Sequence, residues 1–202
     1  MYIKLYNENP NQKHIQQIVE VLKSGGIIIY PTDTVYGIGC DITNQKAVER
    51  IAQIKGVKLK NANFSFICQD LSHLSSYSLP IDNHVFKTLK RNLPGPFTFI
   101  LRANNNVPKL FKTNKRTVGI RIPNNNIILA IIKELGNPIL TTSVYDKDDN
   151  CYIADPEIIN EKYKNKVDII IDGGFGGNEP STVIDCTNNE LEIIRKAKGE
   201  LL

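Results

Sequence analysis

GGIIIYPTDTVYGIG, residues 25–39, is the stretch that decides the predicted fold. The glycines at its start end an amphipathic helix, because the apolar residues before them recur at helical spacing. These residues are Ile15, Ile18, Val19 and Leu22. The β-branched run 27–30 predicts a strand buried on both faces, and Pro31 ends it. The polar residues after Pro31 therefore follow a buried strand, which is where α/β folds place ligand sites.

Helix and strand patterns alternate along the rest of the chain. Helices are expected from Asn44, as a short turn from Asp70, over 83–92 and 127–135, and from Asp155-Pro156 onward. Further strands are expected at 64–68, 97–101, 118–122, 139–142, 167–171, 182–185 and 191–194. The polar stretch DKDDN (146–150) is expected to be a loop. Because several strands follow one another without a helix, we predict one layered α/β domain, residues 1–202, with a sheet of mixed direction.

The composition excludes several classes of protein. Of the 202 residues 41% are apolar, which supports a core and excludes a disordered chain, a collagen-like fibre and a disulfide-stapled miniprotein. No apolar run reaches the length of a membrane span, and residues 1–13 lack a signal-peptide pattern. We therefore expect a cytoplasmic protein with no membrane partner. The formal net charge of +4 permits an anionic partner without requiring one.

Cysteine and histidine are too dispersed to form a metal site. The four cysteines contain no CxxC pair, and the three histidines contain no HExxH motif. We expect no metal bound by the protein's own side chains. We expect the cysteines to be buried thiols in a reducing compartment; they are Cys40, Cys68, Cys151 and Cys186.

Three segments contain polar groups that capping alone does not explain. The first is the turn 31–37, where the hydroxyls of Thr32, Thr34 and Tyr36 could bind a phosphate or an amino acid; the alternative is a turn that satisfies its own backbone. The second is Arg121 within an apolar strand. A buried guanidinium needs a partner, and a ligand carboxylate or phosphate suits its donors, unless the residue faces solvent.

The third segment is the glycine-rich turn DGGFGG (172–177), which is followed by Ser181 and Thr182. Glycines let a backbone approach a ligand closely, and clustered amides can bind anions. Taken alone, the glycines favour a flexible, hairpin-like turn over a ligand site. The segment is neither a dinucleotide-binding fingerprint nor a phosphate-binding P-loop, because a strand follows it and no GxxxxGK[ST] occurs in the chain.

Taken in order, these segments resemble the YrdC/YciO family. The matching stretches are 25–39, LPGPFTFIL (93–101), TVGIRIP (117–123), PILTTS (138–143), VDIIIDGG (167–174), STVID (181–185) and IIRKAKG (193–199). Residues 63–78 look closer to the YciO branch. The resemblance implies a single three-layer domain of the YrdC-like fold, α/β or α+β by different schemes. It also implies an open, twisted sheet of parallel and antiparallel strands with a positively charged concave face.

The resemblance also implies an activity. Family members of the threonylcarbamoyl-AMP synthase type convert L-threonine, bicarbonate and ATP into threonylcarbamoyl-adenylate and pyrophosphate, with Mg²⁺ as cofactor. Partner proteins of tRNA modification then transfer the threonylcarbamoyl group to an adenosine of tRNA. In this comparison the threonine-binding positions are Thr34, Thr117, Arg121, Thr141 and Ser181. The nucleotide-binding positions are Lys55, Lys58, Ser143 and Arg195, with Lys55 and Arg121 as the catalytic residues.

The chain departs from the family pattern at one motif that matters for phosphate chemistry. The family's Lys-x-Arg motif reads Lys55-Gly56-Val57 here, so its arginine is missing, and Lys58 or Lys60 is the nearest replacement. Tyr145 also stands where the family has an amide. Loss of one charge-assisted phosphate contact costs about 2–4 kcal/mol of transition-state stabilisation.

Two alternatives to the synthase reaction stay open at this point. The first is a YciO-type protein with reduced or no adenylate-forming activity that binds double-stranded RNA or tRNA. Its binding residues would be the lysines Lys55, Lys58, Lys60, Lys109, Lys112 and Lys115. The second is a protein that binds another small carboxylate or phosphate ligand through Arg121.

Overall fold

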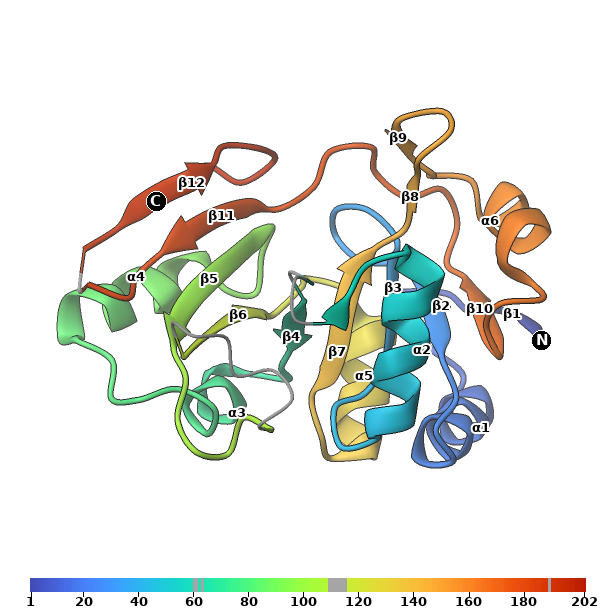
Figure 1. Ribbon diagram of the computed structural model, residues 1–202, viewed down its shortest axis with the longest axis horizontal. Coiled ribbons are helices and arrows are strands. Elements are labelled where there is room, and N and C mark those ends of the chain that lie inside the picture. Colours follow the sequence, from blue (N-terminus) through green and yellow to red (C-terminus); the bar gives the residue numbers. More distant parts are fainter. Residues whose placement is uncertain (60–61, 63, 109–115, 189) are drawn as a thin grey trace.

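One mixed sheet runs through the molecule. Its strands are β1 (Tyr2–Lys4), β2 (Ile28–Tyr30), β3 (Gly37–Asp41), β4 (Ser65–Ile67), β5 (Phe97–Arg102), β6 (Thr117–Arg121), β7 (Ile139–Ser143), β10 (Ile169–Asp172), β11 (Thr182–Asp185) and β12 (Glu192–Arg195). Their spatial order is β1-β10-β2-β3-β7-β4-β6-β5-β11-β12 (Figure 1). The structure is a computed structural model, and it describes residues 1–59, 62, 64–108, 116–188 and 190–202.

Helices cover both faces of this sheet, as separate hydrophobic clusters show. Helices α1 (Gln12–Lys23) and α5 (Asn126–Leu135) pack on one face, where Ile18 and Ile131 contact strand residues such as Ile139. On the other face lie α2 (Gln45–Lys55), α3 (Leu71–Ser75), α4 (Asn83–Asn92) and α6 (Pro156–Tyr163). This confirms the predicted three-layer domain with a mixed open sheet. In the part of the chain that the structure describes, each helix is too short or too polar to cross a membrane.

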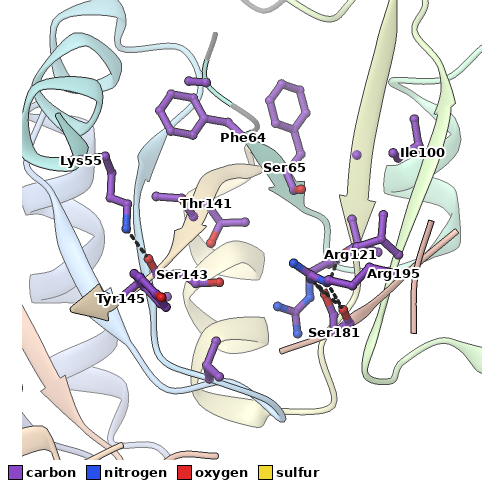
Figure 2. Close-up of a pocket in the computed structure, with 18 of the residues that line it drawn as sticks. Lys55, Phe64, Ser65, Ile100, Arg121, Thr141, Ser143, Tyr145, Ser181 and Arg195 are labelled. Atoms are coloured by element: carbon purple, nitrogen blue, oxygen red, sulfur yellow. Dashed lines mark hydrogen bonds between the residues drawn. The ribbon is translucent and has the colours of Figure 1, made fainter. Parts of the chain in front are cut away.

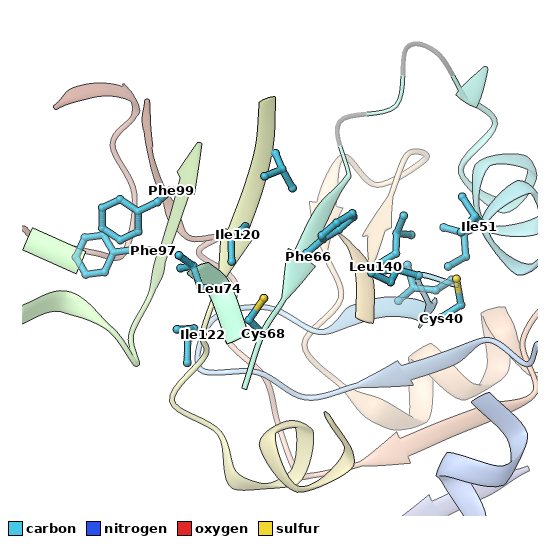
Figure 3. Packing of buried hydrophobic residues seen from close by; sticks show 14 of the residues in the cluster. Cys40, Ile51, Phe66, Cys68, Leu74, Phe97, Phe99, Ile120, Ile122 and Leu140 are labelled. Carbon is cyan, nitrogen blue, oxygen red and sulfur yellow. The ribbon is translucent and has the colours of Figure 1, made fainter. Parts of the chain in front are cut away.

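The larger of the two cores lies between the sheet and helices α2, α3 and α4. Figure 3 shows Phe66, Leu140 and Ile120 lying side by side under these helices, and each is almost completely buried. Complete burial of such a side chain stabilises the folded state by about 1.5–3 kcal/mol. Each has one polar neighbour along its strand, Ser65, Thr141 or Arg121, whose side chain lies on the opposite face of the sheet.

Local capping signals account for the helix bounds. Asn44 accepts a hydrogen bond from the backbone N–H of Ala47 at 3.1 Å, and Asp70 caps α3 through the N–H of His73 at 2.8 Å. Gly56 and Gly136 close α2 and α5 with a positive φ of 63° and 80°. The predicted helix 83–92 agrees with α4 at both ends.

Two strands and a hairpin were not predicted from the sequence. Strand β3 reads GIGCD and lacks the alternation that marks a strand, while β1 has three residues and forms only by pairing with β10. The stretch 146–150, predicted as a loop, is the turn of a hairpin formed by β8 (Tyr145–Asp146) and β9 (Cys151–Tyr152). These elements form by pairing with segments far along the chain, or consist of very short strands. A local sequence pattern predicts neither.

Three of the four cysteines are buried, as expected, and one is not. Cys40, Cys68 and Cys186 lie in the core, and burial raises the pKa of their thiols, to about 12 for Cys186. Cys151 is exposed on β9, so the prediction of four buried thiols is wrong at this position. The error follows from missing the hairpin.

Thiol labelling distinguishes these environments. We expect a charged disulfide reagent to modify Cys151 quickly in the folded protein and the other three only after unfolding, because a buried, protonated thiol is a poor nucleophile. The measurement is the number of thiols modified per chain at pH 7.5, without and with denaturant. Fast modification of more than one thiol in the folded protein contradicts this burial pattern.

Candidate functional site

A cleft of about 1270 Å³ opens on the sheet face that carries α1 and α5. Strand β7 shows how one face serves two purposes, because alternate residues share a face. Ile139 belongs to the cluster under α5, whereas Thr141 and Ser143, further along the strand, line the cleft. On β4, Ile67 and Ser65 divide in the same way. The cleft therefore lies on the part of this sheet face that α1 and α5 do not cover.

Basic and hydroxyl side chains dominate the polar lining of the cleft. The basic residues are Lys55, Arg121, Lys147 and Arg195, and no Asp or Glu occurs among the described residues of the lining. The hydroxyl residues include Ser65, Thr98, Thr117, Thr141, Ser143 and Ser181. Figure 2 shows Lys55 on one side of the cleft and the two arginines on the other. A lining with an excess of positive charge and neutral hydroxyl donors suits a multiply charged anion.

Arg121 ends strand β6 on the floor of the cleft and is 7% exposed. Its Nη2 donates to Asp33 Oδ1 at 3.0 Å and to Thr34 Oγ1 at 2.9 Å. The solvent-facing alternative is therefore wrong, and the partner of the guanidinium is a carboxylate of the chain itself. Burial lowers the pKa of Arg121, and the charge of Asp33 opposes that shift.

The Arg121–Asp33 pair is incompletely satisfied. Among the described residues, Arg121 Nε and Asp33 Oδ2 are buried and have no hydrogen-bond partner. Buried polar atoms are almost always paired, because an unpaired one costs the desolvation of the group. One donor and one acceptor of this ion pair are thus buried without a partner, while the guanidinium as a whole lines the cleft.

The turn 31–37 combines both functions considered for it. Thr32 Oγ1 donates to Val35 O at 2.7 Å and accepts from the N–H of Thr34 at 3.0 Å, so the turn satisfies its own backbone. The hydroxyl of Thr34 is directed to Arg121 and does not line the cleft. Thr34 therefore positions the guanidinium, and its predicted contact with a ligand stays a prediction.

The glycine-rich turn packs against this segment. Gly177 N–H donates to Thr34 O at 2.7 Å, and Tyr36 Oη donates to Gly174 O at 2.6 Å. A Cβ atom on Gly177 would lie 2.4 Å from Thr34 O. These glycines are needed because two backbone segments approach closely, and the described residues of the turn do not line the cleft.

Residues that the sequence comparison selected meet at the arginine side of the cleft. Arg195 donates to Ser181 O from Nη2 at 2.7 Å and from Nε at 3.1 Å. The hydroxyls of Ser181 and Thr98 are 2.8 Å apart. The structure thus places Thr117, Arg121, Ser181 and Arg195 in one lining.

On the opposite side, Lys55 Nζ donates to the backbone oxygen of Ser143 at 2.9 Å. Nearby, Tyr30 Oη donates to Thr141 Oγ1 at 2.5 Å, which orients that hydroxyl. Lys55, Thr141 and Ser143 all line the cleft. Lys58 is exposed and lies outside the lining. Lys60, the other replacement considered for the missing arginine, lies outside the described residues, as do Lys109, Lys112 and Lys115.

Lys147 is a lining residue that sequence reasoning missed. Its Nζ donates to the backbone oxygen of Lys55 at 2.7 Å. The stretch DKDDN resembles any charged surface turn, so no local signal marks this lysine. Its place depends on the hairpin β8–β9.

Lys55 gives the protein a pH dependence that can be measured. Burial, and then the charge of Lys147, lower the pKa of Lys55 in the folded state. Just below the ordinary lysine pKa of about 10.4, the unfolded chain binds more protons at this residue, so its contribution to the free energy of unfolding rises with pH. We expect Lys55→Met to reduce this slope in the pH range just below the ordinary lysine pKa of about 10.4. Urea unfolding of both proteins measures it, and equal slopes contradict the prediction.

The described residues contain no group of three or more His, Cys, Asp and Glu side chains that could hold a metal ion. The donor set of the cleft is cationic and hydroxylic, which does not fit a resident Mg²⁺. Magnesium fits this cleft only as an ion carried by a substrate triphosphate.

Known proteins share both the sequence and the fold of this chain. The sequence model of the Sua5/YciO/YrdC family, described as "Telomere recombination", matches residues 20–197. YciO of Escherichia coli strain K12 is 39% identical over 201 residues, covering 99% of this chain and 97% of that protein. The crystal structure of E. coli YciO superposes with a TM-score of 0.92 over 99% of this chain and 97% of that chain.

More distant relatives carry names that describe an activity or a ligand. A threonylcarbamoyl-AMP synthase of Pseudoalteromonas translucida is 29% identical over 188 residues, covering 90% of this chain and 97% of that protein. The crystal structure of P. abyssi Sua5 complexed with L-threonine superposes with a TM-score of 0.87 at 27% identity, over 98% of this chain and 57% of that one. The match of the family model to most of the chain and the full-length similarity to YciO establish that the chain belongs to the Sua5/YciO/YrdC family.

Proposed function

We propose that the cleft binds ATP, as its magnesium complex, together with L-threonine, and forms threonylcarbamoyl-adenylate from them and bicarbonate. The observation that carries the proposal is the lining itself, in which three basic side chains, Lys55, Lys147 and Arg195, take part in none of the ion pairs of the described residues, and the fourth, Arg121, is paired with Asp33. A triphosphate is the common metabolite group with enough negative charge to match it. The relatives named threonylcarbamoyl-AMP synthase support the choice of reaction.

Arg121 supports an amino acid as the second substrate. An amino acid carries a carboxylate, and the guanidinium of Arg121, which lines the cleft, offers the donors that a carboxylate accepts from. The hydroxyls of Thr117, Thr141 and Ser181 lie in the same lining and offer hydrogen bonds to a threonine side chain. The related Sua5 structure contains L-threonine.

The reaction needs no covalent enzyme intermediate. The threonine ammonium loses one proton to solvent, and the free amine condenses with bicarbonate to give a carbamate and water. A carbamate oxygen then attacks the α-phosphorus of ATP, the bond from that phosphorus to the bridging oxygen breaks, and pyrophosphate leaves. Lys55 and Arg195 stand on opposite sides of the cleft, where their charges can stabilise the negative charge that grows on the phosphates. Tuned general bases are unnecessary for this step.

The test is an incubation with MgATP, L-threonine and ¹⁴C-bicarbonate. We expect threonine-dependent release of pyrophosphate and a labelled adenylate by mass spectrometry. Val57 stands where the family motif has an arginine, and without another cation in that place the reaction is slow. The assay therefore uses enzyme at micromolar concentration and long incubation times. Absence of both products under these conditions overturns the proposal. Release of pyrophosphate that does not depend on threonine contradicts the choice of the amino acid.

RNA or tRNA binding, with or without the adenylate reaction, stays a prediction from the sequence. Four of its six lysines lie outside the described residues, and Lys55 is directed into the cleft, which leaves Lys58 as the exposed one of the described pair. Binding through phosphate contacts must weaken steeply as salt rises. A flat salt response, or no tRNA binding at low salt, contradicts it.

A further inference from the structure

Two ammonium groups lie at the α2 side of the cleft. Lys55, the last residue of α2, donates to Ser143 O at 2.9 Å, while Lys147 donates to the backbone oxygen of Lys55 at 2.7 Å. Both side chains line the cleft. Each ammonium uses one of its three donors in the contact named, so donors remain for a ligand.

The position of Lys147 is determined by its hairpin. The neighbouring residue, Asp146, is buried; its Oδ1 accepts from the N–H of Asp148 at 3.0 Å, and its Oδ2 accepts from Lys162 of α6. The rings of Tyr145 and Tyr152 pack edge to face, with centroids 5.1 Å apart. The hairpin is thus tied to α6 on one side, and Lys147 extends from it toward α2.

Glycine at position 56 makes room for this lysine. A Cβ on Gly56 would lie 3.1 Å from Lys147 Nζ, and the positive φ of 63° already disfavours other residues there. Val57, which follows, lines the cleft without a charge. The second positive charge beside Lys55 therefore comes from a separate part of the chain.

Nothing acidic in the described lining compensates these two charges. Asp146 and Asp149 are both paired with Lys162, and Asp148, which follows Lys147 in sequence, is exposed and lies outside the lining. Burial, and then the charge of Lys147, lower the pKa of Lys55. An anion bound between the two ammonium groups would relieve the repulsion between them.

We propose that Lys147 and Lys55 together form a polyphosphate subsite, and that Lys147 supplies the cationic contact that position 57 lacks. The proposal rests on the proposed function for its source of polyphosphate, the β- and γ-phosphates of ATP, which leave as pyrophosphate. The subsite itself requires only the two lysines. A purely structural alternative exists, because a lysine that donates to the last carbonyls of a helix also caps it.

Titration of the folded protein with inorganic pyrophosphate separates these roles. We expect Lys147→Met to weaken pyrophosphate binding about tenfold or more, which is the effect of removing one charge-assisted contact. Lys147→Arg should retain most of the affinity. The matched control is Lys46→Met, which removes the same charge from an exposed position at the opposite end of α2, away from the cleft; its affinity should equal that of the wild type.

Several outcomes overturn the subsite. Wild-type protein that does not bind pyrophosphate contradicts it, and so does a Lys147→Met protein that melts at a lower temperature yet binds pyrophosphate as the wild type does, since a cap alone predicts that result. If Lys46→Met weakens pyrophosphate binding as much as Lys147→Met does, the effect comes from the total charge of the protein, and the subsite is contradicted. If pyrophosphate binding depends on Lys147 but no adenylate forms, the subsite stands and the proposed function fails. If the Lys147→Met protein forms the adenylate with an unchanged KM for ATP, the proposed function stands and the subsite fails.

Discussion

Replacing Arg121 with methionine is expected to weaken binding of L-threonine at least 100-fold and to lower the free energy of unfolding by about 3–5 kcal/mol. Methionine keeps much of the stem volume but removes every donor. The loss of stability arises because Asp33, whose side chain is 11% exposed, keeps a buried carboxylate without its partner. Calorimetric titration with L-threonine in the presence of MgATP and urea unfolding measure the two effects.

A second variant separates the effects. Combining Arg121→Met with Asp33→Asn removes the uncompensated charge, so most of the stability should return, whereas threonine binding should remain lost. Unchanged threonine affinity in Arg121→Met would remove this residue from the proposed site. Recovery of binding in the double variant would show that the single variant failed only through misfolding.

The second large effect concerns two glycines of the sheet, one on β3 and one on β6. Gly39→Ala is expected to lower the free energy of unfolding by about 1–3 kcal/mol, because its Cβ would lie 2.3 Å from the backbone oxygen of Leu140 and 3.2 Å from the ring of Tyr30. Backbone atoms cannot rotate away, so the pairing of β3 with β7 must shift. Thermal unfolding should show a decrease in Tm of roughly 2–4 °C per kcal/mol.

Gly119→Ala is the matched substitution. Its Cβ would lie 2.8 Å from Ser65 Oγ, a side-chain atom that can rotate, so we expect little change in stability. The added methyl group would occupy the cleft floor, because Gly119 lines it, and ligand affinity should fall. Equal destabilisation by both alanines, or no loss of ligand binding by Gly119→Ala, contradicts this description of the floor.

Local signals explain which parts of the fold could be predicted. The helices carry their caps and apolar spacing within about a dozen residues, and α4 was predicted at both ends. Strand β3 was missed because GIGCD gains its stability from Tyr30, which packs across its glycines, and from β7 far along the chain. Such a strand forms through contacts between segments, which periodicity does not record.

The candidate site was predictable in its residue types and less so in its pairings. Arg121 was selected because a buried guanidinium needs a partner, yet its partner Asp33 lies 88 positions away in sequence. Lys147 was missed for the same reason, since only the hairpin brings it to Lys55. The family comparison selected Lys58 near the missing arginine, whereas the structure places a different lysine in the cleft.

A crystal structure of the protein with MgATP and L-threonine tests the central claim most directly. The claim predicts the threonine carboxylate on the guanidinium of Arg121 and the triphosphate on the Lys55 side of the same cleft, with Lys147 in contact with its terminal phosphates. A threonine or triphosphate bound elsewhere, or an unoccupied cleft at saturating concentrations of both, would contradict it.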